Sequence, residues 1–397
     1  MAHLNTRSPT RFVLRTGDTW RDPYPMYRGL RDADPVHHVA DGDFWFLSRF
    51  TDVFDAARDP ATFSSARGLT VEPDQPGADM GDATPIVFLD PPEHTAFRRL
   101  VGSGFTPRQV TELEDDVRAF VAARLDNLVE GGGGDIVAEL FKPLPSFVVA
   151  HYLGVPAEDR PRFDVWTDQI VAAATQGGTD TATDGIADLL GYFGELIERR
   201  RSQPGDDMVS HLVGLGEDEV STMWVLGFAF TMVAGGNDTT TGLLGGAVQL
   251  LAADPAQRTR LTSGEVPVEV ALEELLRLTS PVQGLARTST RDVELHGVEV
   301  PAGRKVLLLY AAGNRDPERY GPDADSLDVG RRPSQILTFS QGSHHCLGAA
   351  AARLQGRVAL EELLAAYPDF EVDPAGVRWA PGPYVRRPAS VPFVGRP

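Results

Sequence analysis

A single cysteine, Cys346, stands directly before an alanine-rich segment that is predicted to form a helix. A thiol at a helix N-terminus meets the positive end of the helix dipole and unpaired backbone N–H groups, so the thiolate is expected to be favoured. Gly342 and Gly348 on either side allow a sharp bend and the close approach of a flat, bulky group. Phe339 offers an aromatic face and His344 a polar contact. The loop therefore suits a metal-ligating thiolate under a large planar cofactor with an acidic edge.

Other uses of a lone cysteine fit these surroundings less well. Such a residue in a cytosolic protein is most often a small buried hydrophobe. A Cys/His nucleophile pair is poorly served, because His344 and His345 are too close in sequence to be assumed in line with the sulfur. Iron–sulfur and structural zinc sites need about four ligands, mostly thiolates, and the chain has only 1 cysteine. The surrounding residues therefore favour a metal-ligating thiolate.

The string Phe339-Ser340-Gln341-Gly342-Ser343-His344-His345-Cys346-Leu347-Gly348 resembles the haem-binding loop of the cytochrome P-450 superfamily. That loop has an aromatic residue, a glycine, a basic residue, the cysteine and a second glycine at this spacing. Ala349 to Arg353 is similar to the start of the helix that follows the ligand in these enzymes. The resemblance implies haem b (iron protoporphyrin IX) as cofactor and Cys346 as the axial thiolate to its iron. It also implies haem contacts from Phe339, Gly342, His344 and Gly348.

The longest predicted helix contains Ala234-Gly235-Gly236-Asn237-Asp238-Thr239-Thr240-Thr241. Glycine and threonine are weak helix formers, and a Thr hydroxyl can bond the carbonyl one turn back and bend the helix. Taken alone, the segment also fits a packing notch for another helix. It resembles the oxygen-activation segment of P-450 enzymes, which implies that Thr239 hydrogen-bonds dioxygen or its water and that Asp238 passes protons inward. Productive cleavage of an O–O bond needs two protons, so such a relay has a chemical purpose.

Glu274 and Arg277 are spaced i and i+3 on one predicted helix face. In general such a pair is a solvated surface bridge of little energetic worth. It is also similar to the Glu-x-x-Arg pair of P-450 enzymes, which is structural and tied to an arginine ahead of the cysteine loop. Arg331 is the best match for that third member, so these residues are expected to serve folding around haem rather than chemistry.

His94 and Arg98 are spaced i and i+4 on a helix that Asp90 is expected to cap, with Pro91 and Pro92 in its first turn. An exposed pair of this kind would be unremarkable. The segment from Asp90 to Arg99 nevertheless resembles the P-450 segment whose His and Arg bind haem propionates, and Arg287 matches a further propionate arginine. With His344 this gives four donors for two carboxylates, which suits the burial of a dianion.

These motifs occur in P-450 order from Asp90 to Arg353, and the resemblance covers nearly the whole chain. The greatest similarity is to actinobacterial members of family 130. Two departures stand out: Ser340 occupies a position that is commonly glycine, and Ile336 one that is often histidine. Neither touches ligation, and both are candidates for altered haem seating or potential.

The elements that must position these residues follow from periodicity and turn signals. Short strands are expected at Val36–Val39 and Phe44–Leu47, a small sheet within Asp292–Leu309, a loop over Gly68–Thr84 and short strands in the tail. Helices are expected over Tyr24–Asp34, Asp52–Arg58, Pro107–Leu128, Leu144–Leu153, Asp159–Ala174, Thr183–Arg201 and Glu217–Ala253. One more is expected to end near Leu278, and another follows Cys346 and runs to about Ala366. The longest would span roughly 55 Å. The fold class predicted is mainly α with small β-sheets (α+β), the cytochrome P-450 fold with a long central helix over haem.

Composition limits the class of protein. Hydrophobic residues make up 42% and charged residues 23%, which is ordinary for a globular protein. A net charge of −19 argues against nucleic acid and anionic membranes as partners. The first residues lack an apolar signal core, and the stretch from Val225 to Ala234 is about half of the roughly 20 residues that cross a bilayer. We expect a cytoplasmic, disulfide-free protein, and with no linker or repeat, one domain over 1–397.

The resemblance implies a monooxygenase that inserts one oxygen atom from O2 into an organic substrate, by hydroxylation or by N- or O-demethylation. No flavin or nicotinamide fingerprint is evident, so electrons are expected from a separate ferredoxin and ferredoxin reductase fed by NAD(P)H. A haem-binding sensor or ligand-sequestering protein is the alternative, which Asp238-Thr239 disfavours because a binder needs no proton relay. A cysteine-dependent transferase is a third hypothesis.

A small-molecule substrate pocket is expected between several segments. Its walls are predicted from the loop Gly68–Thr84, residues Ala174–Thr181, the central helix, Val282–Leu285 and Tyr384-Val385, with few charges outside the first loop. This composition favours an apolar or amphipathic substrate. The individual residues predicted to line it are Val233, Gly236, Val282, Leu285 and Val385.

A basic docking surface for an acidic ferredoxin is expected around the Cys346 loop. Its members are Arg99, Arg331, Arg332, Arg353 and Arg357. Two of them also have internal alternatives, since Arg331 is expected to pair with Glu274 and Arg353 to cap local carbonyls.

Overall fold

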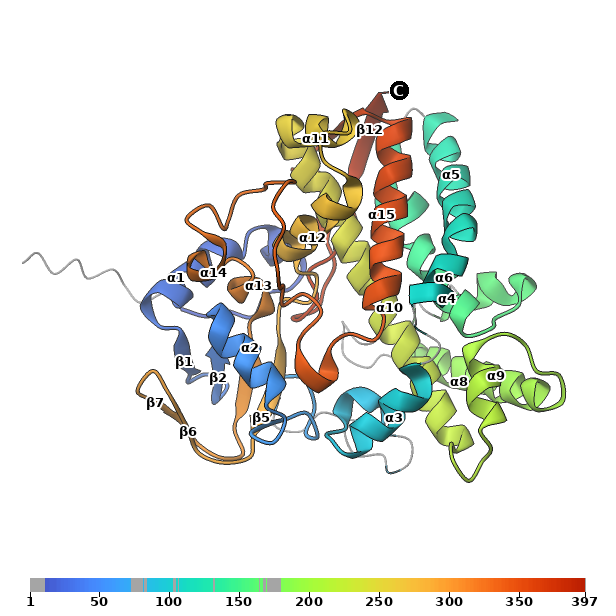
Figure 1. Ribbon diagram of the computed structural model, residues 1–397, viewed down its shortest axis with the longest axis horizontal. Coiled ribbons are helices and arrows are strands. Elements are labelled where there is room, and N and C mark those ends of the chain that lie inside the picture. Colours follow the sequence, from blue (N-terminus) through green and yellow to red (C-terminus); the bar gives the residue numbers. More distant parts are fainter. Residues whose placement is uncertain are drawn as a thin grey trace, which may run out of the picture.

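The computed structural model describes residues 11–72, 81, 84–102, 105, 107–130, 133–163, 165–166, 169 and 180–396. Long helices gather on one side of the molecule, and most strands lie on the other side (Figure 1). The helices are α1 (Tyr24–Ala33), α2 (Phe50–Arg58), α3 (Glu93–Gly102), α4 (Pro107–Glu112), α5 (Glu114–Glu130), α6 (Pro143–Tyr152), α8 (Asp180–Ser202), α9 (Met208–Gly214), α10 (Thr222–Ala253), α11 (Pro255–Thr262), α12 (Val268–Thr279), α13 (Tyr310–Gly313), α14 (Pro317–Tyr320) and α15 (Ala349–Ala366).

Short single turns supplement these helices. They are the 3-10 turns η1 (Gly17–Arg21), η3 (Ile86–Phe88), η6 (Ala157–Asp159) and η7 (Gly342–His344), and the π-helical turn η5 (Val137–Phe141).

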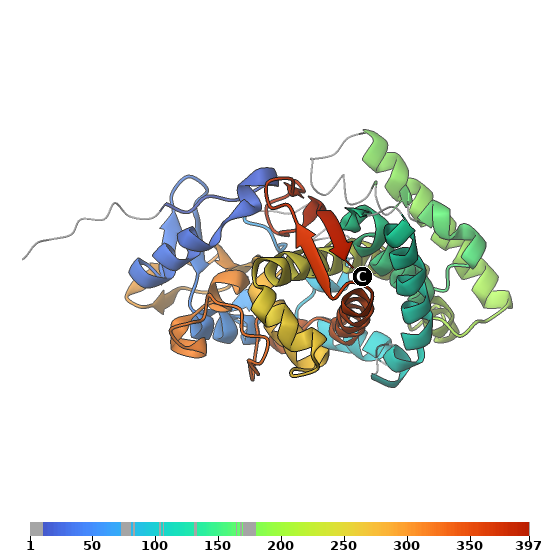
Figure 2. The same ribbon diagram turned by 90° about the horizontal axis from the view of Figure 1, so that it is seen from above.

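The strands form small sheets, so the predicted fold class, mainly α with small sheets, is confirmed. The largest sheet has the order β1-β2-β8-β5-β3, and in it β2 runs parallel to β8 with Phe44 opposite Lys305. A second sheet, β4-β12-β9, packs beside the C-terminal ends of the helices (Figure 2). The strands are β1 (Val36–Val39), β2 (Phe44–Leu47), β3 (Phe63–Ser64), β4 (Gly134–Asp135), β5 (Leu285–Ser289), β6 (Val293–Leu295), β7 (Val298–Val300), β8 (Lys305–Leu308), β9 (Asp369–Val372), β10 (Arg378–Trp379), β11 (Pro388–Ser390) and β12 (Pro392–Arg396).

Helix α10 runs through the middle of the molecule, with α15 beside it (Figure 1). Its 32 residues correspond to about 48 Å. The predicted start at Glu217 is wrong, because Ser221 caps the helix by accepting a hydrogen bond from the Trp224 N–H. Glu217 lies in the preceding turn, where its carboxylate accepts the Thr222 N–H at 2.9 Å.

Glycines on α10 let other segments approach its backbone. A Cβ on Gly242 would lie 2.9 Å from the Arg386 carbonyl oxygen, and one on Gly245 would lie 2.3 Å from Pro388 Cγ. Both contacts are shorter than real side chains tolerate. The residues before and at the start of β11 therefore lie directly on the helix.

Most other predicted boundaries are confirmed within one to three residues, with two exceptions. The helix expected over 107–128 is divided into α4 and α5. Asp90 is not a side-chain cap for α3, because its carboxylate accepts hydrogen bonds from the Ser65 N–H and the Ser64 hydroxyl. Half of the predicted helix over 159–174 lies outside the described residues, as does most of the pocket wall predicted at 174–181.

No helix in the described part of the chain combines the length and apolar character needed to cross a membrane.

Candidate active site

The loop that carries Cys346 is folded back on itself by its own backbone. The Cys346 N–H donates to the Phe339 carbonyl at 2.8 Å. Gly342 has a φ of +70°, and a Cβ there would lie 2.8 Å from the Ala57 carbonyl oxygen. Gly342 thus meets both reasons for a glycine, the left-handed backbone and the close approach of α2.

Ser340 occupies the position where the resemblance leads one to expect glycine. Its φ of +57° lies in the left-handed region, which an L-residue adopts at a cost of about 1 kcal/mol. The side chain is buried, and its hydroxyl lies 3.3 Å from the Tyr310 hydroxyl. The buried contact with Tyr310 offsets part of the backbone strain that Ser340 introduces in place of glycine.

The Cys346 thiol does not have the lowered pKa that the sequence suggested. The side chain keeps an exposed face, yet it lies so deep among protein groups that burial raises the pKa of the thiol. The Gly348 N–H, Arg98 and Arg353 act in the opposite direction but are outweighed. The predicted preference for thiolate is therefore wrong for the protein part alone, and a metal ion would be needed to hold the sulfur deprotonated.

Four side chains predicted to bind carboxylates are brought close to Cys346. The rings of His94 and His344 lie 4.1 Å apart, centroid to centroid. Burial, with the charges of Arg287 and His94, lowers the pKa of His344 to about 3. Burial, with Arg98 next, lowers the pKa of His94. These groups are crowded into a site that disfavours further positive charge.

The hydrogen bonds of this cluster leave donors uncommitted. His94 Nδ1 is buried and has no protein partner, and Arg287 Nη1 donates to the carbonyl of the preceding residue at 2.8 Å. The nearby carboxylate of Asp90 is held by Ser64 and Ser65. In the described part of the chain neither Arg98 nor Arg287 forms an ion pair with a carboxylate, and the two histidines add ring N–H donors. This cluster of hydrogen-bond donors fits the acidic edge of haem, and the single exposed thiol fits its iron.

Phe339 lies against the start of α15. The Arg353 guanidinium carbon is 4.6 Å from the centre of the Phe339 ring, and Arg353 also binds Glu273. The predicted carbonyl-capping role of Arg353 is replaced by these contacts. Gly348, the residue before α15, has no atom within 4 Å of the position where a Cβ would stand. The loop therefore stays open on that side.

Asp238 and Thr239 are consecutive residues of α10, and their side chains have different partners. The Thr239 hydroxyl donates to the Gly235 carbonyl at 3.0 Å, one turn back, as predicted. The Asp238 carboxylate lies 2.8 Å from Arg387 Nε. Arg387 is a contact that sequence reasoning missed, and the only signal was a second arginine beside Arg386 near the end of the chain.

Two predicted pocket residues on α10 are on the wrong side. Val233 is fully buried in the core, and a Cβ on Gly236 would lie 2.7 Å from Val149 of α6. Ala234 and Gly235 are the exposed positions in this part of the helix. The prediction failed because the apolar character of Val233 did not reveal which face of α10 packs against α6.

The remaining predicted pocket residues lie together. Val282 and Val385 form an antiparallel β-bridge, and Leu285 begins β5 directly after the Val282 segment. All three side chains are half-buried. The hydroxyl of Tyr384 accepts the Val71 N–H at 2.9 Å, which ties the loop at 68–72 to the same wall.

Glu274, Arg277 and Arg331 form the predicted structural group. Glu274 and Arg277 are both 0% exposed, and their carboxylate and guanidinium make two contacts of 2.7 Å. Arg331 Nε lies 3.1 Å from Glu274. Arg277 also donates to the Asn314 and Ala324 carbonyls, so the group holds α12 against the segment that leads to the cysteine loop.

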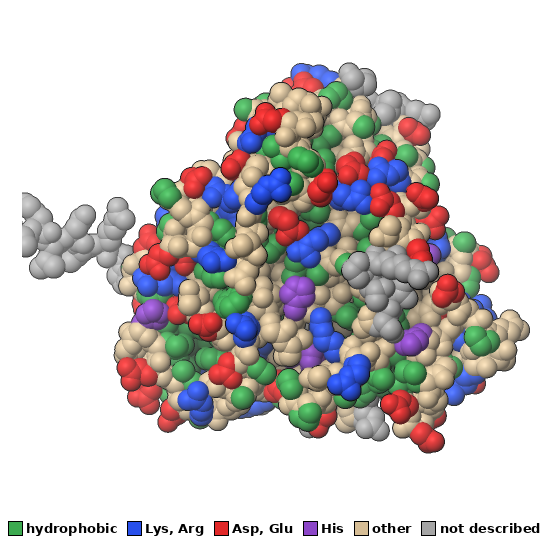
Figure 3. Space-filling model, viewed as in Figure 1, with side chains coloured by type: hydrophobic (Ala, Val, Ile, Leu, Met, Phe, Trp, Pro, Cys, Tyr) green, Lys and Arg blue, Asp and Glu red, His purple; other side chains and the backbone are tan. Residues whose placement is uncertain are grey.

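The arginines predicted to form a docking surface are mostly engaged with acids. Arg331 pairs with Glu274 and Asp323, Arg353 with Glu273, and Arg357 with Glu114 and Glu361. Figure 3 shows acidic and basic side chains interspersed over this face. Arg99 and Arg332 are exposed. A broad basic patch is therefore replaced by paired charges.

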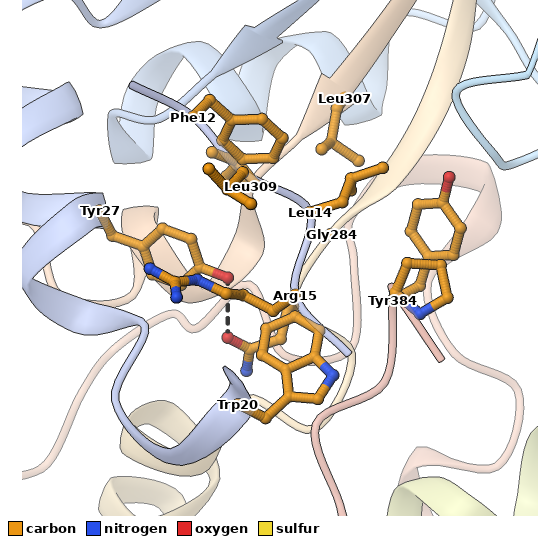
Figure 4. A pocket seen from close by; sticks show the side chains of 12 residues that line it. Phe12, Leu14, Arg15, Trp20, Tyr27, Gly284, Leu307, Leu309 and Tyr384 are labelled. Carbon is orange, nitrogen blue, oxygen red and sulfur yellow. Dashed lines mark hydrogen bonds between the residues drawn. The ribbon is translucent and has the colours of Figure 1, made fainter. Parts of the chain in front are cut away.

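A small crevice lies away from Cys346, between the N-terminal segment and the β5–β8 edge (Figure 4). Phe12, Leu14, Trp20 and Tyr27 line it, and the Tyr27 hydroxyl donates to Gln283 at 3.1 Å. Its interior of about 10 Å³ is far below the roughly 300 Å³ at which ligand pockets begin. It is a packing crevice.

Comparisons with known proteins agree with this geometry. The family model described as "Cytochrome P450" matches residues 268–380. Cytochrome P450 130 of Mycobacterium tuberculosis is 58% identical over 395 residues, which cover 96% of this chain and 97% of that protein. Vitamin D(3) 25-hydroxylase of Pseudonocardia autotrophica is 37% identical over 92% of each chain.

A solved structure shows the same fold. Cytochrome P450 CYP109Q5 from Chondromyces apiculatus has a TM-score of 0.85 and 32% identity, over 95% of this chain and 96% of that chain. The predicted resemblance to family 130 and the predicted haem cofactor are confirmed. This chain belongs to the cytochrome P450 family, whose members are haem-binding monooxygenases.

Proposed function

We propose that this P450 monooxygenase inserts one oxygen atom from O2 into an apolar or amphipathic small molecule, by hydroxylation or by N- or O-demethylation. Bound haem would supply the oxygen activation, and the protein would supply the ligand, the counter-charges and the path for protons. The observation that carries the proposal is the exposed thiol of Cys346 beside two arginines and two histidines that can donate hydrogen bonds.

The residue roles follow from charge and placement. Cys346 is assigned as the axial thiolate, and His94, Arg98, Arg287 and His344 as donors to the haem propionates. Burying two carboxylates is favourable only when each accepts charge-assisted hydrogen bonds. The unpartnered Nδ1 of His94 supports a role as one of these donors.

Thr239 and Asp238 are assigned to proton handling. The Thr239 hydroxyl, which now donates to Gly235, can turn to donate on the exposed side of α10. Asp238 has a carboxylate 18% exposed, open enough to exchange a proton with solvent. An adjacent acid and alcohol can thus move protons toward the reacting oxygen.

The substrate class follows from the pocket wall. Val282, Leu285 and Val385 present aliphatic side chains, and Ala234 and Gly235 leave the facing stretch of α10 without bulk. Such a wall favours contact with an apolar molecule. The relative named for the 25-hydroxylation of vitamin D(3) is consistent with a large apolar substrate.

A separate ferredoxin and ferredoxin reductase are proposed as the source of electrons. Exposed Arg99 and Arg332 are the positions that support attraction of an acidic partner. Arg332→Glu is expected to slow reduction by ferredoxin several-fold at low ionic strength, while peroxide-driven turnover is retained. Arg357→Glu is a poor test, because it also breaks the ion pairs with Glu114 and Glu361.

The proposal is tested by the optical spectrum of the ferrous–CO complex. Wild type is expected to absorb at the position characteristic of thiolate ligation, and Cys346→His to move the band to the histidine-ligated position. Titration with a compound library, followed by haem spin-state shifts, then identifies ligands for product analysis. A wild-type spectrum without the thiolate band would refute the assignment of Cys346 as the iron ligand. Small molecules that bind but yield no oxygenated product would favour the alternative of a haem-binding sensor.

A further inference from the structure

An ion pair joins the acid of α10 to the C-terminal segment. Arg387 Nε lies 2.8 Å from Asp238 Oδ2, and the two side chains are only 14% and 18% exposed. A charge-assisted hydrogen bond between two partly buried side chains is screened less by salt than a pair on the open surface. The ion pair that fixes the Asp238 carboxylate therefore influences any proton transfer through that carboxylate.

The backbone around Arg387 is fixed from two sides. The Arg387 carbonyl accepts the Ala380 N–H at 3.1 Å, and the Arg386 N–H donates to the Pro281 carbonyl at 2.8 Å. On the helix side, a Cβ at Gly242 would lie 2.9 Å from the Arg386 carbonyl oxygen, so the glycine admits the backbone directly before Arg387. Arg387 is thus presented to Asp238 by rigid structure.

The same segment belongs to the predicted pocket wall. Val385 forms the bridge to Val282, and the Tyr384 carbonyl accepts the Gln283 N–H at 2.8 Å. Only one residue separates Val385 from Arg387. The carboxylate of Asp238 is therefore anchored to the chain segment that contacts substrate under the proposed function.

Consecutive residues on a helix point about 100° apart. Arg387 draws the Asp238 carboxylate toward the C-terminal segment, whereas the Thr239 hydroxyl is bonded along α10 to Gly235. A guanidinium this close favours the ionised form of a carboxyl group. Arg387 thus controls both the direction of the carboxylate and how readily it takes up a proton.

We propose that Arg387 is a positioning residue for Asp238, which holds the carboxylate ionised and oriented and thereby sets the supply of protons to Thr239. In this step one Asp238 oxygen gains a proton from solvent water and passes it through a further water to the Thr239 oxygen, whose own proton moves on to the reacting oxygen. No electrons move through these residues. The inference rests on the proton-handling role given above.

The test compares variants of the haem-loaded protein with a surrogate ferredoxin and ferredoxin reductase, and the pH profile of O2 consumption is recorded. Arg387→Gln is expected to slow consumption several-fold and to move the limb of the profile that Asp238 governs to higher pH by about one unit. Arg387→Lys is expected to restore most of the shift. Arg378→Gln removes an exposed arginine from neighbouring β10 and is the matched control, with an unchanged profile expected.

Thermal unfolding gives a readout independent of turnover. Asp238→Asn and Arg387→Gln should each lower the midpoint, and the double variant should fall no further than the more affected single one. Arg387→Met, which keeps the aliphatic stem, serves if Arg387→Gln does not fold.

Additive losses in unfolding, or a profile in Arg387→Gln that superimposes on wild type, would overturn the inference. An Asp238→Asn profile equal to that of wild type would overturn it as well. A wild type without the thiolate-type ferrous–CO band would instead refute the proposed function, so the two failures are distinguishable.

Discussion

Glu274→Gln isolates the energetic role of the buried charge group on α12. Gln keeps the size of the side chain but removes the negative charge that faces Arg277 at 2.7 Å through two contacts and Arg331 at 3.1 Å. Arg277 is fully buried, and its remaining partners are the neutral carbonyls of Asn314 and Ala324 and the Tyr320 ring. Its charge would be left uncompensated, which costs about 3–5 kcal/mol in comparable buried pairs.

Urea unfolding of the haem-loaded protein, followed by tryptophan fluorescence, measures this loss. A lower midpoint with an unchanged slope would report lost stability alone. Glu265→Gln is the matched control, because Glu265 makes a surface pair with Arg260 and should have little measurable effect. A loss below about 1 kcal/mol for Glu274→Gln would refute the reasoning, since it would mean that Arg277 is neutralised by other groups.

Three further predictions concern single positions. Ser340→Ala is expected to lower the free energy of unfolding by about 1 kcal/mol through loss of its hydroxyl contact, whereas Ser340→Gly should be close to neutral because it also relieves the positive φ; equal losses would argue against strain. Thr239→Ala should retain haem and substrate binding but divert electrons to peroxide, measured as product per NAD(P)H consumed; an unchanged ratio would place the relay elsewhere. Gly245→Ala should destabilise the protein by about 1–3 kcal/mol by displacing Pro388, whereas Gly191→Ala, with no atom within 4 Å, should not; thermal melts of both variants compare them.

Local spacing was sufficient to predict much of the site. His94 and Arg98 share one helix, and Cys346 follows a tight turn at Gly342, because i, i+4 spacing and glycine placement have direct geometric meaning. The same holds for Glu274 and Arg277, whose spacing dictates that they face one another.

Properties that depend on which residues pack against a side chain could not be predicted from the sequence. Val233 is apolar whether it faces a pocket or α6, and its burial is decided by neighbours far away in sequence. The pairing of Asp238 with Arg387 joins residues in contact only after the C-terminal segment folds across α10. The raised pKa of Cys346 is likewise a result of burial, which the helix N-terminus alone did not reveal.

The parallel pairing of β2 with β8 has a consequence for the order of folding. Phe44 and Lys305 are neighbours in the sheet although about 260 residues separate them in the chain. During synthesis, which proceeds from the N-terminus, β2 must wait until β8 has left the ribosome. Such non-local pairing raises contact order and slows folding. The helices around α10 can form their local contacts earlier, so the sheet that carries Arg287 is expected to be completed late.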